Sequence, residues 1–129
     1  MPRLQAAEPH LYVGDVDEAC AFYANTLGFH VALKYGAPPT FAIVQRDAVR
    51  LALRLVCSPV FTDGIRDREE LLAASLLLPR ADSIRALFTS YDAAGVPFHR
   101  RLAPRPWGAL DFIVRDPDGN LLQFVSAAD

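Results

Sequence analysis

Short apolar runs and one amphipathic stretch alternate along the first half of the chain. The run from His10 to Val13 predicts a strand. From Val16 onward, apolar residues recur at helical spacing, which predicts a helix that Asp15 or Asp17 caps and that ends at Gly28. Runs rich in β-branched and aromatic residues predict three further strands, at 29–35, 40–44 and 49–56. The predicted order in this half is β-α-β-β-β.

The second half repeats this order. Asp82 is a candidate N-cap for a helix that ends at Gly95, and an apolar run before it predicts a strand at 75–78. The helical stripe consists of Ile84, Leu87, Phe88, Tyr91 and Ala94. Strands are predicted at 96–100, 110–115 and 121–126, with a tight turn at 116–120. Two stretches are predicted to be irregular, 57–67 (before a helical turn at 69–73) and 102–108.

The repeat sets the fold class. Two βαβββ halves predict an α+β protein, with repeat one at about 7–57, a linker at about 58–73 and repeat two at about 74–127 of a single domain, 1–129. Neither half buries a four-stranded sheet alone. We therefore expect the halves to pair and to wrap curved mixed sheets around a shared cleft. Periodicity does not say how the halves pair.

Composition removes several classes of function. The formal net charge is −2 and the pI about 5.9, so the chain has no general attraction to nucleic acid or to an anionic membrane. No apolar run approaches the roughly 20 residues of a membrane span, and no signal-peptide core is present. Cys20 and Cys57 are too few for a disulfide scaffold. We expect a bacterial, cytoplasmic protein with no nucleic-acid or membrane partner.

Three segments together resemble a known superfamily. They are LYVGDVDEACAFYANTLGF at 11–29, FAIVQRD at 41–47 and PWGALDFIVRDPDGNLLQF at 106–124. The chain is similar to the vicinal-oxygen-chelate (glyoxalase/bleomycin resistance protein/dioxygenase) superfamily, in its bleomycin-resistance-like branch. The resemblance implies the paired βαβββ fold. The superfamily contains lyases, isomerases, extradiol dioxygenases, thiol transferases and plain binding proteins, so membership does not name the chemistry.

The resemblance also implies where a metal would be held. Enzymes of the superfamily bind one divalent ion through His, Glu or Gln at four strand positions, two in each half. Those positions fall on Glu8, Ala52 (or Leu51 in a register shifted by one), Ala74 and Gln123. An alanine methyl donates nothing to a metal. We therefore expect no metal site of the family type and no cofactor, although a shifted register could use His10.

Aromatic side chains are the candidates for ligand contact. A ligand in the cleft would gain apolar contact and stacking from an aromatic wall. The resemblance implies that Trp107, in a stretch with Pro104 and Pro106, stacks on the ligand; the alternative is that it only packs its own loop. The other candidates are Tyr35, Phe41, Phe61 and Phe112, and for Phe41 and Phe112 ordinary core packing is an equal alternative.

Charge leaves the ligand class open. Arg50 and Arg54 flank Ala52 by two positions, so they share its face and would favour an anionic ligand, unless this strand turns them to water. An acidic cleft would instead favour cationic antibiotics. The acidic candidates are Glu8, Asp63, Asp67 and Asp111.

The resulting hypothesis is a metal-free protein that sequesters a small aromatic molecule. The resemblance implies a homodimer, either unswapped or domain-swapped, and in the swapped form 57–73 would be the exchange hinge. The alternative from another class is a divergent enzyme, a glyoxalase-like lyase or isomerase or an extradiol-type dioxygenase. It would use Glu8 as a general base, or Glu8, His10 and Gln123 as an unorthodox metal site. A domain retained for interaction alone is the third possibility.

Overall fold

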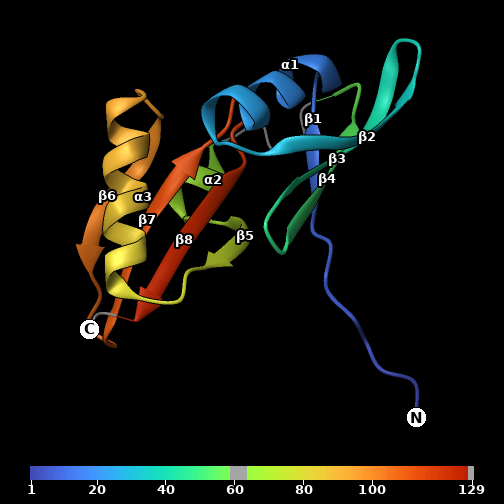
Figure 1. The fold of residues 1–129 in the computed structure, drawn as a ribbon. Coiled ribbons are helices and arrows are strands. Elements are labelled where there is room, and N and C mark those ends of the chain that lie inside the picture. The colour runs from blue at the N-terminus through green and yellow to red at the C-terminus, as the bar shows by residue number, and fades with distance from the viewer. Residues whose placement is uncertain (59–63, 128–129) are drawn as a thin grey trace.

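The computed structural model describes residues 1–58 and 64–127 and confirms two successive βαβββ halves (Figure 1). The first half contains β1 (His10–Val13), α1 (Val16–Ala21), the π-helical η1 (Phe22–Thr26), β2 (His30–Gly36), β3 (Pro39–Arg46) and β4 (Val49–Leu55). Then follow α2 (Ile65–Arg68), β5 (Leu72–Leu77), α3 (Ala81–Ala93), β6 (Phe98–Pro104), β7 (Ala109–Arg115) and β8 (Leu121–Ala127). Within the described ranges, no helix is long and apolar enough to cross a membrane.

Each half forms one four-stranded mixed sheet. The strand orders are β1-β4-β3-β2 and β5-β8-β7-β6, and in each sheet the first strand pairs in parallel with the last while the other pairs are antiparallel. The registers place His10 opposite Ala52 and Ser75 opposite Gln123. Over the described residues the two sheets stay separate and do not close into a barrel. The segment before β1 extends away from both sheets (Figure 1).

One face of each sheet packs against helices and forms the core. In the first sheet, Leu11, Leu51 and Leu53 are completely buried on the side of α1. In the second sheet, Phe112 and Phe124 stack with ring centroids 4.9 Å apart beneath α3. Each such side chain stabilises the fold by roughly 1.5–3 kcal/mol. Because side chains alternate along a strand, the intervening residues lie on the opposite face, which we call the open face.

Polar contacts join the two halves. Tyr23 Oη donates to Asp116 Oδ2 at 2.9 Å. In the other half, Tyr91 Oη donates to the carbonyl oxygen of Leu27 at 2.7 Å, which also accepts from Arg46 Nη1 at 2.6 Å. Burial raises the pKa of the Tyr23 and Tyr91 hydroxyls, so both remain protonated donors at neutral pH. These contacts fix how the halves pair.

Local sequence signals predict most of the elements, but several bounds differ, as where β5 begins at Leu72 and not at residue 75. Asp15 caps α1 as expected, but the helix continues as η1. Arg80, rather than Asp82, occupies the N-cap of α3, and its side chain makes no capping hydrogen bond. The helical turn between the halves is at Ile65–Arg68 instead of 69–73. Strand β6 extends into the stretch that the sequence predicts to be irregular, because it pairs there with β7.

Candidate ligand-binding site

The open face of the first sheet carries a row of aromatic side chains around one arginine. Tyr12 on β1 lies opposite Arg54 on β4, Arg54 opposite Phe41 on β3, and Phe41 opposite Tyr35 on β2. Directly opposite residues project to the same face of a sheet, so these four side chains stand side by side. Tyr12 is 38% exposed and Tyr35 is 70% exposed. We call these four residues the Arg54 row.

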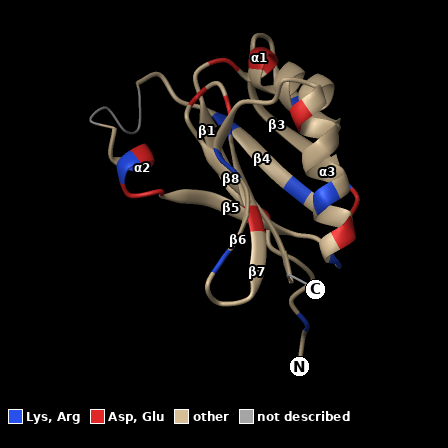
Figure 2. Cartoon of the chain, turned by 90° about the vertical axis from the view of Figure 1, so that its left-hand side faces the viewer, with Lys and Arg blue, Asp and Glu red and all other residues tan. Residues whose placement is uncertain are grey.

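The two arginines of this face differ in their partners. Arg50 Nε lies 3.0 Å from Glu8 Oε2, and Arg50 Nη1 donates to Gln45 Oε1 at 3.3 Å. The Arg54 guanidinium lies 5.8 Å from the centroid of the Tyr12 ring, a cation–π contact, and forms no ion pair with any described residue. Both arginines lie on the open face, and basic segments are visible along β4 in Figure 2.

The open face of the second sheet carries a polar network instead. Asp111 is completely buried, and its Oδ2 accepts from Arg100 Nη2 at 2.7 Å and from Gln123 Nε2 at 2.9 Å. Arg105 Nε lies 3.4 Å from Asp111 Oδ1. Arg100 Nη1 also donates to Glu70 Oε1 at 2.7 Å. The predicted acidic candidate Asp111 is therefore neutralised by arginines of its own sheet, and Asp67 pairs similarly with an arginine, Arg115, at 2.9 Å.

The positions to which the resemblance assigns metal ligands do not form a ligand set. Ala52 offers a methyl group on the open face. The Gln123 amide is engaged at both ends, since Oε1 accepts from Ser75 Oγ at 2.7 Å and Nε2 donates to Asp111. In residues 1–58 and 64–127, no group of three His, Cys, Asp or Glu side chains could hold a metal ion. The Glu8 carboxylate forms an ion pair with Arg50, with Oε2 3.0 Å from Nε.

The predicted position Ala74 requires correction. Ala74 lies opposite Leu122 and packs against the core, whereas Ser75 lies opposite Gln123 on the open face. A register irregularity between Leu72 and Ala74 shifts the strand by one residue, and a shift of one reverses the face. Sequence alignment of the repeats could not detect this irregularity.

Two of the predicted aromatic residues, Tyr35 and Phe41, lie in the Arg54 row. Tyr12 completes the row, although the prediction did not include it. Strand alternation could have found Tyr12, because residues two apart along a strand point to the same face of the sheet. Tyr12 therefore shares a face with His10, and His10 lies opposite Ala52. The His10 ring also borders the row, with its centroid 6.4 Å from that of Phe41.

The other predicted aromatic residues lie elsewhere. Trp107 is 72% exposed in the turn between β6 and β7, in the second half of the chain and away from the Arg54 row. Phe112 is completely buried and stacks on Phe124 in the core beneath α3, which is the core-packing alternative for this residue and not a place in the cleft. Phe61 and Asp63 lie outside the described residues.

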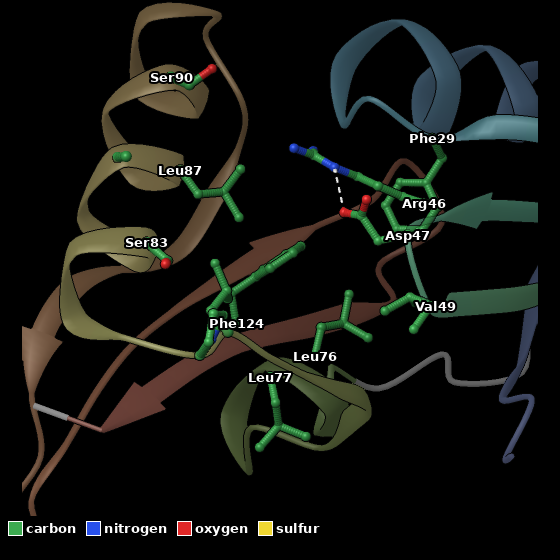
Figure 3. Close-up of a pocket in the computed structure, with 14 residues that line it drawn as sticks. Phe29, Arg46, Asp47, Val49, Leu76, Leu77, Ser83, Leu87, Ser90 and Phe124 are labelled. Carbon is green, nitrogen blue, oxygen red and sulfur yellow. Dashed lines mark ion pairs between the residues drawn. The ribbon is translucent and has the colours of Figure 1, made fainter.

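A cavity of about 630 Å³ opens between the halves (Figure 3). Leu87 of α3 and Leu76 and Phe124 of the second sheet form its apolar wall. Arg46 and Asp47, at the tip of the β3–β4 hairpin, lie on the opposite side, with Arg46 Nε 3.9 Å from Asp47 Oδ2. The Arg46 guanidinium already holds Leu27 and Tyr91, so its visible role is to join the halves. No sequence pattern predicted this cavity, since it arises from the packing of distant elements.

The chain is an α+β protein built from two successive βαβββ modules, each with one open sheet face. The chain belongs to the Glyoxalase/Bleomycin resistance protein/Dioxygenase superfamily, whose sequence profile matches residues 4–124. A comparison with curated proteins gives no match.

Solved structures share this fold over nearly the whole chain. A glyoxalase/bleomycin resistance protein/dioxygenase from Alicyclobacillus acidocaldarius has a TM-score of 0.77 and 22% identity, covering 97% of this chain and 92% of that chain. The bleomycin-binding protein from bleomycin-producing Streptomyces verticillus, complexed with copper(II)-bleomycin, has a TM-score of 0.71 and 26% identity over 100% of both chains. The bleomycin resistance determinant encoded on transposon Tn5 has a TM-score of 0.70 and 22% identity, covering 96% and 98%.

Proposed function

We propose that this chain is a bleomycin-resistance-like binding protein that sequesters a small aromatic compound and requires no metal to do so. The Arg54 row is the observation that carries the proposal, because it presents aromatic surface on an open sheet face. Stacking on such rings contributes about 0.5–1.5 kcal/mol per good pair beyond simple burial. The similarity to the bleomycin-binding protein of Streptomyces verticillus supports a binding function.

The proposal includes a homodimer in which a second copy covers the row. Large apolar side chains are exposed in both halves, Leu33 (48%) and Tyr35 on the open face of the first sheet, Leu77 (81%) on β5, and Trp107 in the β6–β7 turn. Exposed apolar surface of this kind is typical of interaction sites. A two-fold dimer would place the second sheet of one copy over the first sheet of its partner and form two equivalent sites. The predicted exchange hinge, 57–73, lies partly outside the described residues.

Equilibrium binding of a neutral probe, 2-naphthamide, tests the proposal. We expect Tyr35→Ala to weaken its affinity about tenfold, since the substitution removes a stacking surface, while the matched surface variant Arg85→Ala on α3 binds as wild type does. The probe should be recovered unchanged. Absence of binding, or equal affinity in the Tyr35→Ala variant, would contradict the proposed site.

The mass of the protein in solution tests the dimer separately. Light scattering on the wild-type protein should give twice the chain mass. The Trp107→Ala variant should shift that equilibrium toward monomer if the second sheet covers the first. If the wild-type protein is a monomer and still binds the probe, the proposed dimer is contradicted and the proposed binding function stands.

A further inference from the structure

The open face of the first sheet has a local charge opposite to that of the whole chain. Among its described residues, two arginines, Arg50 and Arg54, stand against one carboxylate, Glu8, which leaves a charge of +1 on a protein of net charge −2. Lys34 of β2 adds nothing, because it alternates with Tyr35 and pairs with Asp17 of α1 at 2.8 Å. The excess positive charge is therefore confined to one arginine.

Geometry identifies that arginine. Glu8 is within 3.0 Å of Arg50 and neutralises it. Arg54 lies four residues further along β4 than Arg50, and its cross-strand neighbours are the aromatic residues Tyr12 and Phe41. A guanidinium presents planar, forked donors that match a carboxylate, and aromatic neighbours exclude water from one side of such a pair. Arg54 is thus a cation with its hydrogen-bonding fork available, set in the middle of a stacking surface.

We propose that the ligand of the Arg54 row is a planar aromatic acid, whose ring stacks on Tyr12, Tyr35 or Phe41 and whose carboxylate pairs with Arg54. The inference rests on the proposed binding function and specifies the chemical class of the ligand. It excludes a cationic aromatic compound as the preferred ligand of this face, because the described part of the face (residues 1–58) offers no carboxylate other than that of Glu8, which is already paired. Arg54 would pair in the same way with a sulfonate or phosphonate group on the same ring.

Three probes that share the naphthalene ring separate charge from stacking. They are 2-naphthoate, which is anionic, 2-naphthamide, which is neutral, and 2-naphthylmethylammonium, which is cationic. We expect 2-naphthoate to bind about tenfold more tightly than 2-naphthamide, the order of magnitude of one charge-assisted pair at a partly exposed site. The cation should bind more weakly than either. Raising the salt from about 0.05 M to about 0.5 M should weaken only the anion.

Variants then assign the preference to one residue. Arg54→Gln should bring the affinities for 2-naphthoate and 2-naphthamide to within about twofold and leave that for 2-naphthamide near the wild-type value. Arg85→Gln on α3 removes the same charge at a distance and should keep the preference. Glu8→Gln releases Arg50, so it should strengthen 2-naphthoate binding and leave 2-naphthamide unchanged.

The outcomes distinguish the two levels of the proposal. Equal binding of 2-naphthoate and 2-naphthamide, both weakened by Tyr35→Ala, would overturn the acidic ligand and keep aromatic binding on the row. A preference for the acid that survives Arg54→Gln would also overturn the assignment to Arg54. Failure of all three probes to bind would overturn the binding function and, with it, the inference about the ligand.

Discussion

Tyr23 Oη donates a 2.9 Å hydrogen bond to Asp116 Oδ2, and this contact links η1 of the first half to the turn after β7, 93 residues further along the chain. Tyr23 is 0% exposed and Asp116 is 3% exposed. Asp116 Oδ1 also accepts from the backbone N–H groups of Asp118 (2.9 Å) and Asn120 (2.8 Å). The carboxyl group therefore shapes the turn and at the same time holds it against the other half.

Removal of the Tyr23 hydroxyl should destabilise the protein without changing its fold. Tyr23→Phe leaves a buried acceptor with one donor fewer, which costs about 1–3 kcal/mol in free energy of unfolding. Urea unfolding followed by circular dichroism measures this cost. Tyr35→Phe, the same change on an exposed ring, should leave the unfolding free energy within about 0.5 kcal/mol of wild type. Equal stabilities of the two variants would show that the contact contributes nothing.

The titration of Asp116 should make stability fall as the pH rises. Burial raises the pKa of Asp116 above its ordinary value of 3.8, although hydrogen bonds from Asn120, Tyr23 and Asp118 act in the opposite direction. The native state therefore holds the proton more tightly than the unfolded chain. The contribution of this group to stability is fully present below 3.8 and is lost as the pH rises through the raised native pKa.

A variant isolates this effect from the other carboxyl groups. Asp116→Asn does not titrate, so the wild-type unfolding free energy minus that of Asp116→Asn should decrease with increasing pH across this window. Urea unfolding at closely spaced pH values gives both curves. A difference that increases with pH would mean that the hydrogen bonds outweigh burial and would reverse the predicted direction.

The fold was largely predictable because its signals are local. Gly28 and Gly95 end the helical stripes with positive φ values of 82° and 76°, and the turn at 116–120 has Gly119 at a φ of 81°. Each of these positions is read from a few neighbouring residues, and the repeat of the pattern then identifies the two halves. The pairing of the halves depends on contacts such as Tyr23 with Asp116, which no local pattern encodes.

Strand alternation predicted which residues of the site share a face of the sheet, and it predicted nothing further about the site. Alternation placed Arg50 and Arg54 together on one face, but only the folded structure shows that Glu8 neutralises the first and not the second. Asp111 stands in an apolar strand without any local sign of the arginines that surround it. The register irregularity in β5 reversed the faces of Ala74 and its neighbour Ser75, and one-residue shifts of this kind are set by tertiary packing.

The Asp111 network should be far more sensitive to substitution than an exposed ion pair. Asp111→Ala leaves the partly buried Arg105 without its carboxylate and Arg100 with Glu70 as its remaining partner, which costs about 3 kcal/mol in unfolding free energy. The matched control is Asp92→Ala, which breaks the exposed pair between Asp92 and Arg101 and should cost about 1 kcal/mol or less. Thermal and urea unfolding of both variants test this ranking. Comparable losses would mean that water, rather than the network, already solvates Asp111.

Metal loading is the last test, and its expected result follows from the chemistry of the donor atoms. Gln123 offers an amide whose two ends are held by Ser75 and Asp111, and Ala52 offers no donor, so Ni, Zn, Fe and Mn would each find too few ligands. After loading and dialysis, elemental analysis should find far less than one metal ion per chain. Gln45→Ala serves as a control for the loss of a glutamine elsewhere. One bound ion per chain that disappears in Gln123→Ala and persists in Gln45→Ala would establish a metal site, and lyase and dioxygenase assays would then replace the search for a sequestered ligand.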